Sequence, residues 1–224
     1  MMMQTNLELI RLVPLFAMLT EAQATAFANA VVKRRYKRGE TIVEQGKKTD
    51  ALFILINGRA RVVAADRDGH EVILATLYPG DHIGEMSLID GKPHSATVCA
   101  DVQTDTLILE RAEFLRCLPE NTSVAYAVMR GLVQRLRHAD RKIESLALMD
   151  VYGRVARVLL ELAEEMPGGG LVVREKMAHR DIAKMIGASR EMVSRVMKTL
   201  QESGLIEVLP DGTIMARERL TSYG

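Results

Sequence analysis

Between residues 34 and 110 the chain is a series of short apolar runs separated by glycines, which restricts this part to β structure. The glycines recur about every 11 residues, and short strands with turns at such intervals are typical of a β-sandwich or barrel. Asp68-Gly69 lies between two runs and predicts a hairpin turn, because glycine adopts the positive φ that this turn needs. The expected strands cover residues 41–43, 52–56, 60–64, 72–77, 96–100 and 106–109.

A helical period flanks these runs on both sides, first at residues 21–32 and again from residue 121 to about residue 149. In the second segment apolar residues recur at alternating spacings of three and four, the pattern of a helix that pairs with another helix. The stripe consists of Met129, Leu132, Leu136, Ala139, Ile143 and Leu146. We expect it to form the interface of a parallel homodimer. The alternative is that it packs on the chain's own β domain.

The C-terminal part has the pattern of a winged helix-turn-helix. Asp150 begins an amphipathic helix that ends at the Pro-Gly-Gly-Gly of residues 167–170. A helix at residues 180–186 stops at Gly187, and Ser189 can cap a second helix at residues 190–202. Apolar runs at residues 205–209 and 213–215 flank a Pro-Asp-Gly turn and predict the hairpin of the wing.

Charge is concentrated where such a unit would meet DNA. The whole chain has a net charge of +1, which by itself favours no partner. Residues 174–198 hold seven basic and three acidic residues, a local net charge of +4. Arginine can make two parallel hydrogen bonds to guanine, and glutamate can accept one from cytosine. The predicted DNA-binding residues are Arg180, Ser189, Arg190, Glu191, Ser194, Arg195 and Lys198. A merely solvated helix face is the alternative.

Several motifs together resemble the family of the cAMP receptor protein and FNR, the Crp-Fnr regulators. They are GEMSL at 84–88, HSATV at 94–98, LMDV at 148–151, GRVA at 153–156 and IGASREMVSR at 186–195. The resemblance covers residues 20–216. It implies an α+β protein with a β-roll sensor at residues 1–120, a dimerising helix at 121–149 and a winged helix-turn-helix at 150–224. It also implies palindromic DNA as partner, with a TGTGA-like or a TTGAT-like half-site, and contact with RNA polymerase if the protein is an activator.

In cyclic-nucleotide-binding members of this family, the segment that matches Gly84 to Thr97 holds the ligand. The resemblance implies that Glu85 accepts a hydrogen bond from a ribose hydroxyl, and that Gly84, Ser95 and backbone amides meet the phosphate. His94 departs from the pattern, because such members usually have arginine there. The effector is therefore open between cAMP, another nucleotide such as cyclic di-GMP, a different ligand and none. The expected effector-binding residues are Gly84, Glu85, Met86, Ser87, His94, Ser95, Ala96, Ala139 and Asp140.

Other classes of function lack their sequence signals. The chain has no apolar run long enough to cross a membrane and no secretion signal, so we expect a cytoplasmic protein. Cys99 and Cys117 are too few for an iron–sulfur cluster. The widely spaced His70 and His82 favour neither a metal site nor an enzyme, although haem stays open. We expect no metal and no required cofactor. A cyclic-nucleotide module that acts on a protein partner is the rival interpretation.

Overall fold

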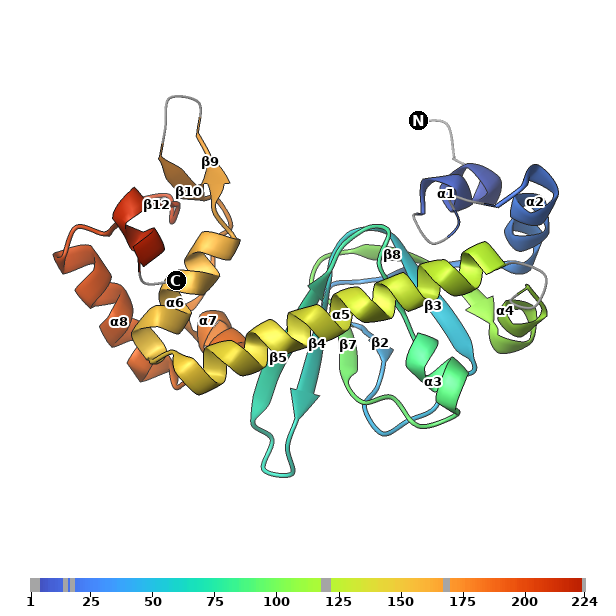
Figure 1. Cartoon of the computed structure of the whole chain (residues 1–224), viewed down its shortest axis with the longest axis horizontal. Coiled ribbons are helices and arrows are strands. Elements are labelled where there is room, and N and C mark those ends of the chain that lie inside the picture. The colour runs from blue at the N-terminus through green and yellow to red at the C-terminus, as the bar shows by residue number, and fades with distance from the viewer. Residues whose placement is uncertain (1–4, 14–15, 17–18, 118–121, 167–169, 223–224) are drawn as a thin grey trace. The chain divides into compact units, whose positions relative to one another are not determined.

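The computed structural model describes residues 5–13, 16, 19–117, 122–166 and 170–222 (Figure 1). The chain forms two compact units, Met1–Leu136 and Arg137–Gly224, and the boundary between them lies inside one long helix, α5 (Thr122–Leu148). Each unit has its own apolar core. Among the described residues, no helix is long and apolar enough to span a bilayer.

Two four-stranded antiparallel sheets build the first unit, in the orders β1-β8-β3-β6 and β2-β7-β4-β5. The strands are β1 (Val32–Tyr36), β2 (Thr41–Val43), β3 (Ala51–Asn57), β4 (Ala60–Ala65), β5 (Glu71–Leu77), β6 (His82–Ile83), β7 (Thr97–Ala100) and β8 (Thr104–Glu110). The six runs predicted to be strands are confirmed. The helix expected at residues 21–32 is shorter, because Val32 already belongs to β1.

Strand β3 contributes to two apolar clusters because both of its faces are buried. Phe53 and Leu55 point into a cluster that includes residues of both sheets. Leu52 and Ile54 point the other way, into a second cluster that helices cover. This explains why β3 reads as one continuous apolar run rather than an alternation. The helices of this unit are α1 (Asn6–Leu12), α2 (Glu21–Ala30), α3 (Glu85–Asp90), α4 (Arg111–Cys117) and the first part of α5.

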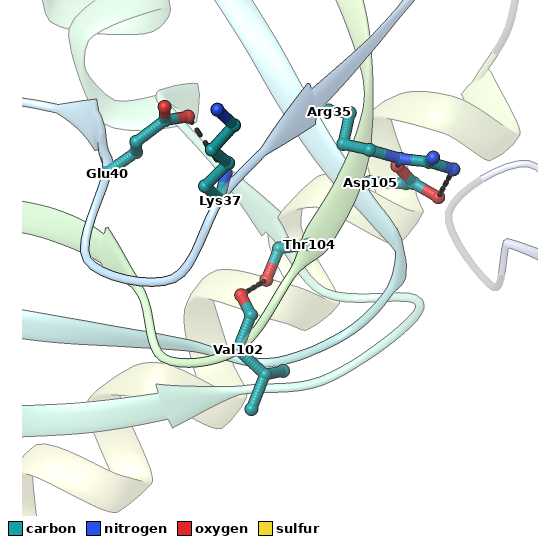
Figure 2. A network of polar contacts seen from close by, with 6 residues as sticks. All are labelled: Arg35, Lys37, Glu40, Val102, Thr104 and Asp105. Carbon is teal, nitrogen blue, oxygen red and sulfur yellow. Dashed lines mark hydrogen bonds and ion pairs between the residues drawn. The ribbon is translucent and has the colours of Figure 1, made fainter.

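Polar contacts hold the paired strands β1 and β8 and the turns beside them, as Figure 2 shows. Arg35 Nε lies 2.6 Å from the Oδ1 of Asp105, which is buried. The hydrogen bond and charge of Arg35 hold the pKa of Asp105 below its usual range. The Thr104 hydroxyl donates to the Val102 carbonyl at 2.9 Å, and the Lys37 backbone N–H donates to Glu40 at 2.9 Å.

The second unit is a small helical core closed by a sheet. Asp150 caps α6 (Val151–Glu161) by accepting from the Gly153 backbone N–H at 2.8 Å, as its position predicts. The predicted wing is the hairpin β11 (Ile206–Val208) and β12 (Ile214–Ala216). It belongs to a sheet of order β11-β12-β10-β9, with β9 (Glu164–Glu165) and β10 (Leu171–Val173). The helix-turn-helix consists of α7 (His179–Ile186) and α8 (Arg190–Glu202), and the 3-10 turn η2 (Glu218–Ser222) follows the wing.

Candidate functional site

Gly84 places the start of α3 directly against β3. Its φ is 96°, in the left-handed region, and it is the N-cap residue of α3. A Cβ atom at this position would lie 2.6 Å from the backbone oxygen of Ala51 in β3. Only glycine meets both conditions without strain. Gly84 therefore fixes where the next residue, Glu85, enters the β-roll.

Replacing Gly84 by alanine is expected to destabilise the protein by about 3 kcal/mol, through backbone strain and the contact with Ala51. Gly91→Ala is the matched control. Gly91 ends the same helix with φ 70°, and a Cβ there has no neighbour within 4 Å. Its cost should be about 1 kcal/mol. Urea unfolding of both variants checks this, and equal losses would contradict the role given to the close approach.

Glu85 is a buried carboxylate tied to the long helix. It is 1% exposed, and its Oε1 lies 2.6 Å from Nη1 of Arg135 in α5. Its Oε2 has no hydrogen-bond partner among the described residues. Burial raises the pKa of Glu85, and the nearby Arg135 guanidinium opposes that rise. One oxygen of this buried carboxylate is therefore hydrogen-bonded, and the other can still accept a hydrogen bond.

Arg135 also donates to the backbone oxygen of His82 in β6. The His82 imidazole is buried, and its Nε2 has no partner among the described residues. A Cβ at Gly131 of α5 would lie 2.9 Å from Cε1 of His82, so glycine leaves the space that the ring fills. Burial, assisted by the charge of Arg135, lowers the pKa of His82 to about 4. His82 is therefore a neutral packing partner of α5.

The depressed pKa of His82 predicts a loss of stability in acid. The unfolded chain binds a proton at His82 below pH 6.5, and the folded chain does so only near pH 4. Stability is unaffected above pH 6.5 and falls by about 3 kcal/mol as the pH drops from 6.5 to 4. Urea unfolding across this range measures the effect, and His82→Gln should remove most of the slope. A wild-type protein equally stable at both ends would contradict it.

His94 is engaged by its own β-roll. It is buried, and its Nε2 lies 2.7 Å from the Thr49 hydroxyl. Its backbone N–H donates to the Lys47 carbonyl, and its carbonyl accepts from the Gly46 N–H. Burial lowers the pKa of His94. The position where the family pattern has arginine therefore holds a histidine that binds the 46–49 loop, through its ring to Thr49 and through its backbone to Gly46 and Lys47.

The other expected effector residues lie in different environments. Ser87 is buried and donates to the Lys92 carbonyl at 2.7 Å, which closes the turn after α3. Ala96 is buried and Ser95 is exposed. Met86 is 51% exposed, so its side chain does not join Glu85 and Ser87 in the interior. Ala139 and Asp140 are exposed residues of α5, beyond the point where the second unit begins.

The long helix α5 has an inner and an outer face. The inner face holds Val128 and Leu132, which pack on the core of the first unit. At Leu132 the packing follows the alternative given above, because this half-buried side chain covers its own core, and its place in a dimer interface stays a prediction. Met129, Leu136, Ile143 and Leu146 are exposed as expected. An unbroken exposed stripe with spacings of three and four consists of Tyr126, Met129, Val133, Leu136, Asp140, Ile143 and Ala147.

Helix α8 and its N-cap residue carry the predicted DNA-binding groups, except for Arg180, which lies in α7. Ser189 caps it by accepting from the Met192 backbone N–H at 3.2 Å. Hydrogen bonds from the backbone N–H of Glu191 and from the Ser189 hydroxyl lower the pKa of the Glu191 carboxyl, so it stays an acceptor. Buried apolar residues fix the opposite side of the helix. The exposed members of the predicted set are Arg180, Ser189, Arg190, Glu191, Arg195 and Lys198.

Ser194 differs from its neighbours because it is only half exposed, and its hydroxyl lies 2.8 Å from Nδ1 of His179 in α7. Sequence reasoning missed His179, as it missed Arg135 beside Glu85 and Thr49 beside His94. No local pattern reveals these pairs, because their members are 15, 50 and 45 residues apart.

Comparison with known proteins agrees with this geometry. A model of the cyclic nucleotide-binding domain matches residues 33–121, and one of the Crp-like helix-turn-helix domain matches residues 153–223. The cAMP-activated global transcriptional regulator Vfr of Pseudomonas aeruginosa is 35% identical over 79% of this chain and 85% of its own. The cyclic AMP receptor protein of Thermus thermophilus is 34% identical over 92% of this chain and 93% of its own.

A solved structure extends the likeness to three dimensions. The c-di-GMP-responsive global regulator CLP of Xanthomonas campestris matches 86% of this chain and 96% of its own, with 26% identity and a TM-score of 0.75. The two matched domains follow each other along the chain in the same order as the β-roll and the helix-turn-helix of the structure. The chain therefore belongs to the Crp-Fnr family and is a DNA-binding transcription regulator of that family's type.

Proposed function

We propose that this regulator is a homodimer that binds a nucleotide beside Glu85 and, in response, reads a palindromic DNA site with α8. The observation that carries the proposal is the buried Glu85 carboxylate. One of its oxygens lies on Arg135 of α5, and the other has no partner among the described residues. A buried acceptor without a partner is costly, and a ligand hydroxyl would supply the missing hydrogen bond. Because Arg135 belongs to α5, a ligand at Glu85 also acts on the helix that carries the dimer face.

A nucleotide suits this site for three reasons. A ribose 2′-hydroxyl is a donor for Oε2 of Glu85. The left-handed turn at Gly84 and the backbone amides near Ser95 offer donors to a phosphate. Relatives are named as cAMP-activated, and CLP as c-di-GMP-responsive.

His94 makes tight binding of cAMP at this site less favourable. Its Nε2 is taken by Thr49, and burial lowers its pKa, so it offers no fixed positive charge to a cyclic phosphate. A charge-assisted contact of the missing kind is worth about 1.5–3 kcal/mol. We therefore infer that cAMP binds this protein more weakly than it binds a pocket with arginine at this position. Cyclic di-GMP is the second nucleotide to test.

The experiment titrates cAMP and cyclic di-GMP into the full-length protein by calorimetry, and repeats DNA-binding assays at saturating nucleotide. At least one nucleotide should bind and raise the affinity for a palindromic site. Glu85→Gln should weaken that nucleotide roughly 10-fold to 100-fold. Glu110→Gln, an exposed glutamate at the end of β8, is the control and should change nothing. DNA affinity indifferent to both nucleotides would contradict effector control by them and favour a regulator without a nucleotide ligand.

His94→Arg gives a second, opposite prediction. An arginine at this position restores a permanent cation with a planar fork. We expect the affinity for cAMP to rise roughly 10-fold to 100-fold, which the same calorimetric titration measures. Thr49→Val tests whether the gain comes merely from breaking the contact between His94 and Thr49. An equal gain in both variants would contradict the role of the charge.

On the DNA side, two copies of α8 would enter adjacent major grooves about one helical turn apart. The ligand can favour this arrangement only through its higher affinity for the DNA-binding state. The exposed Arg190, Glu191 and Arg195 suit the guanine and cytosine of a TGA-containing half-site. Such a protein works in the cytoplasm and, if it activates transcription, contacts RNA polymerase.

A further inference from the structure

The contact between His179 and Ser194 joins the two helices of the helix-turn-helix. His179 is the first residue of α7, and Ser194 lies in the second turn of α8. Nδ1 of the imidazole lies 2.8 Å from the Ser194 hydroxyl oxygen. Both side chains are half exposed. Ser194 is four residues after Arg190 and next to Arg195, so the contact lies among the groups proposed to meet base edges.

Stability alone does not require this hydrogen bond. The interface between α7 and α8 is held by buried apolar residues such as Ile182, Val193 and Met197. A half-exposed hydroxyl can be satisfied by water, so removing its partner leaves no buried group without a hydrogen bond. What the contact does is fix the orientation of the hydroxyl. A serine hydroxyl has one proton and two lone pairs, and the imidazole nitrogen engages one of these functions.

The orientation decides what the recognition helix offers to DNA. If the hydroxyl donates to Nδ1, only lone pairs are left to face outward, and these suit the amino groups of adenine or cytosine. If Nδ1 carries the proton, the serine proton is free for the acceptors of guanine or thymine. A free serine would rotate and could serve either kind of base. Within each tautomer the imidazole thus leaves the serine hydroxyl able to serve only one of these two kinds of base.

We propose that His179 is a specificity-determining positioning residue, which orients the Ser194 hydroxyl toward one base pair in each half-site of double-stranded DNA. The inference rests on the proposed reading of DNA by α8 and adds a residue of α7 to it. His179 acts through Ser194 and needs no base contact of its own.

The test compares wild type with Ser194→Ala, His179→Ala and the double variant. Each full-length protein is titrated, at one salt concentration, with the best palindromic site and with every single-base change of its half-site. Ser194→Ala should lower discrimination at one base pair by about fivefold. His179→Ala should lower it at the same base pair by a similar factor, and the double variant should lose no more than either single variant.

Two conservative variants separate orientation from folding. His179→Asn keeps a polar atom near the place of Nδ1 and should retain discrimination, whereas His179→Gln moves that atom outward and should lose it. Thr199→Ala is the matched control, because the Thr199 hydroxyl of α8 donates to the Arg195 carbonyl one turn back in the same helix. It should leave discrimination unchanged. Retained discrimination in His179→Asn also shows that the unit folds.

Three results would overturn the inference. His179→Ala could weaken all sites and non-specific DNA equally, its effect could multiply with that of Ser194→Ala, or Asn and Gln could behave alike. A wild-type protein that binds all the half-site variants equally would instead overturn the proposed reading of DNA, and this inference with it. The two failures are therefore distinguishable from the wild-type measurement alone.

Discussion

Replacing Arg195 by alanine is expected to abolish sequence-specific DNA binding and to leave the fold intact. Arg195 is exposed on α8, and the apolar core of the second unit lies on the other side of that helix. A bidentate arginine–guanine contact is worth about 1–3 kcal/mol, and a dimer on a palindrome would lose two of them. The affinity for the specific site should fall roughly 30-fold to 20,000-fold. Competition gel shifts against mutated half-sites measure the loss.

Lys198→Ala is the control, because it removes a positive charge from α8 without removing a proposed contact to a base. Lys198 is exposed one turn after the reading residues and lies 3.6 Å from Glu202. Its loss should weaken binding to all sequences equally and reduce the dependence of affinity on salt. If Arg195→Ala behaved like Lys198→Ala, with discrimination retained, Arg195 would be only a phosphate contact.

Val133→Glu is expected to convert the protein to monomers. Val133 lies on the exposed face of α5, half exposed and between Met129 and Leu136. In a parallel pair the two introduced carboxylates would face each other across the seam, where like charges repel. The affinity for a palindrome should fall at least about 100-fold, because each copy must then bind its half-site separately. Analytical ultracentrifugation and the same gel shifts test both statements.

Leu132→Ala is the comparison that separates the two faces of α5. Leu132 packs on the core of the first unit, so its truncation should lower the free energy of unfolding by about 2 kcal/mol and leave the dimer in place. Val133→Glu should do the reverse. A dimer that survives Val133→Glu but dissociates in Leu132→Ala would show that the inner stripe is the interface.

Much of the fold follows from local patterns in the sequence. The glycine-separated runs predict the strands because alternation and turn residues act over a few positions, and β3 reads as buried because its two faces meet two cores. Ser189 is predicted as a cap because a short polar side chain before an apolar period can bond the free amides of the first turn. Asp150 is predicted only to begin a helix, and the structure shows that it caps that helix. Gly187 ends α7 in the left-handed conformation, as its position indicates.

The candidate site was less predictable, because its decisive contacts are long-range. The sequence pattern places Leu132 in the apolar stripe on α5, whereas in the structure Leu132 packs on the first core and Val133 is exposed. Glu85 was found from its motif, but its link to Arg135 depends on how α5 lies on the β-roll. The depressed pKa of His82 likewise comes from burial that no local pattern reveals.

The most direct test of the account is in vitro selection of random double-stranded DNA by the full-length protein, followed by footprinting of the enriched sequence. The account predicts a palindrome with two half-sites whose centres are about 10 base pairs apart, each with a TGA-like core and each protected by one copy. Enrichment of no sequence, or of a single asymmetric element protected by one copy, would contradict it.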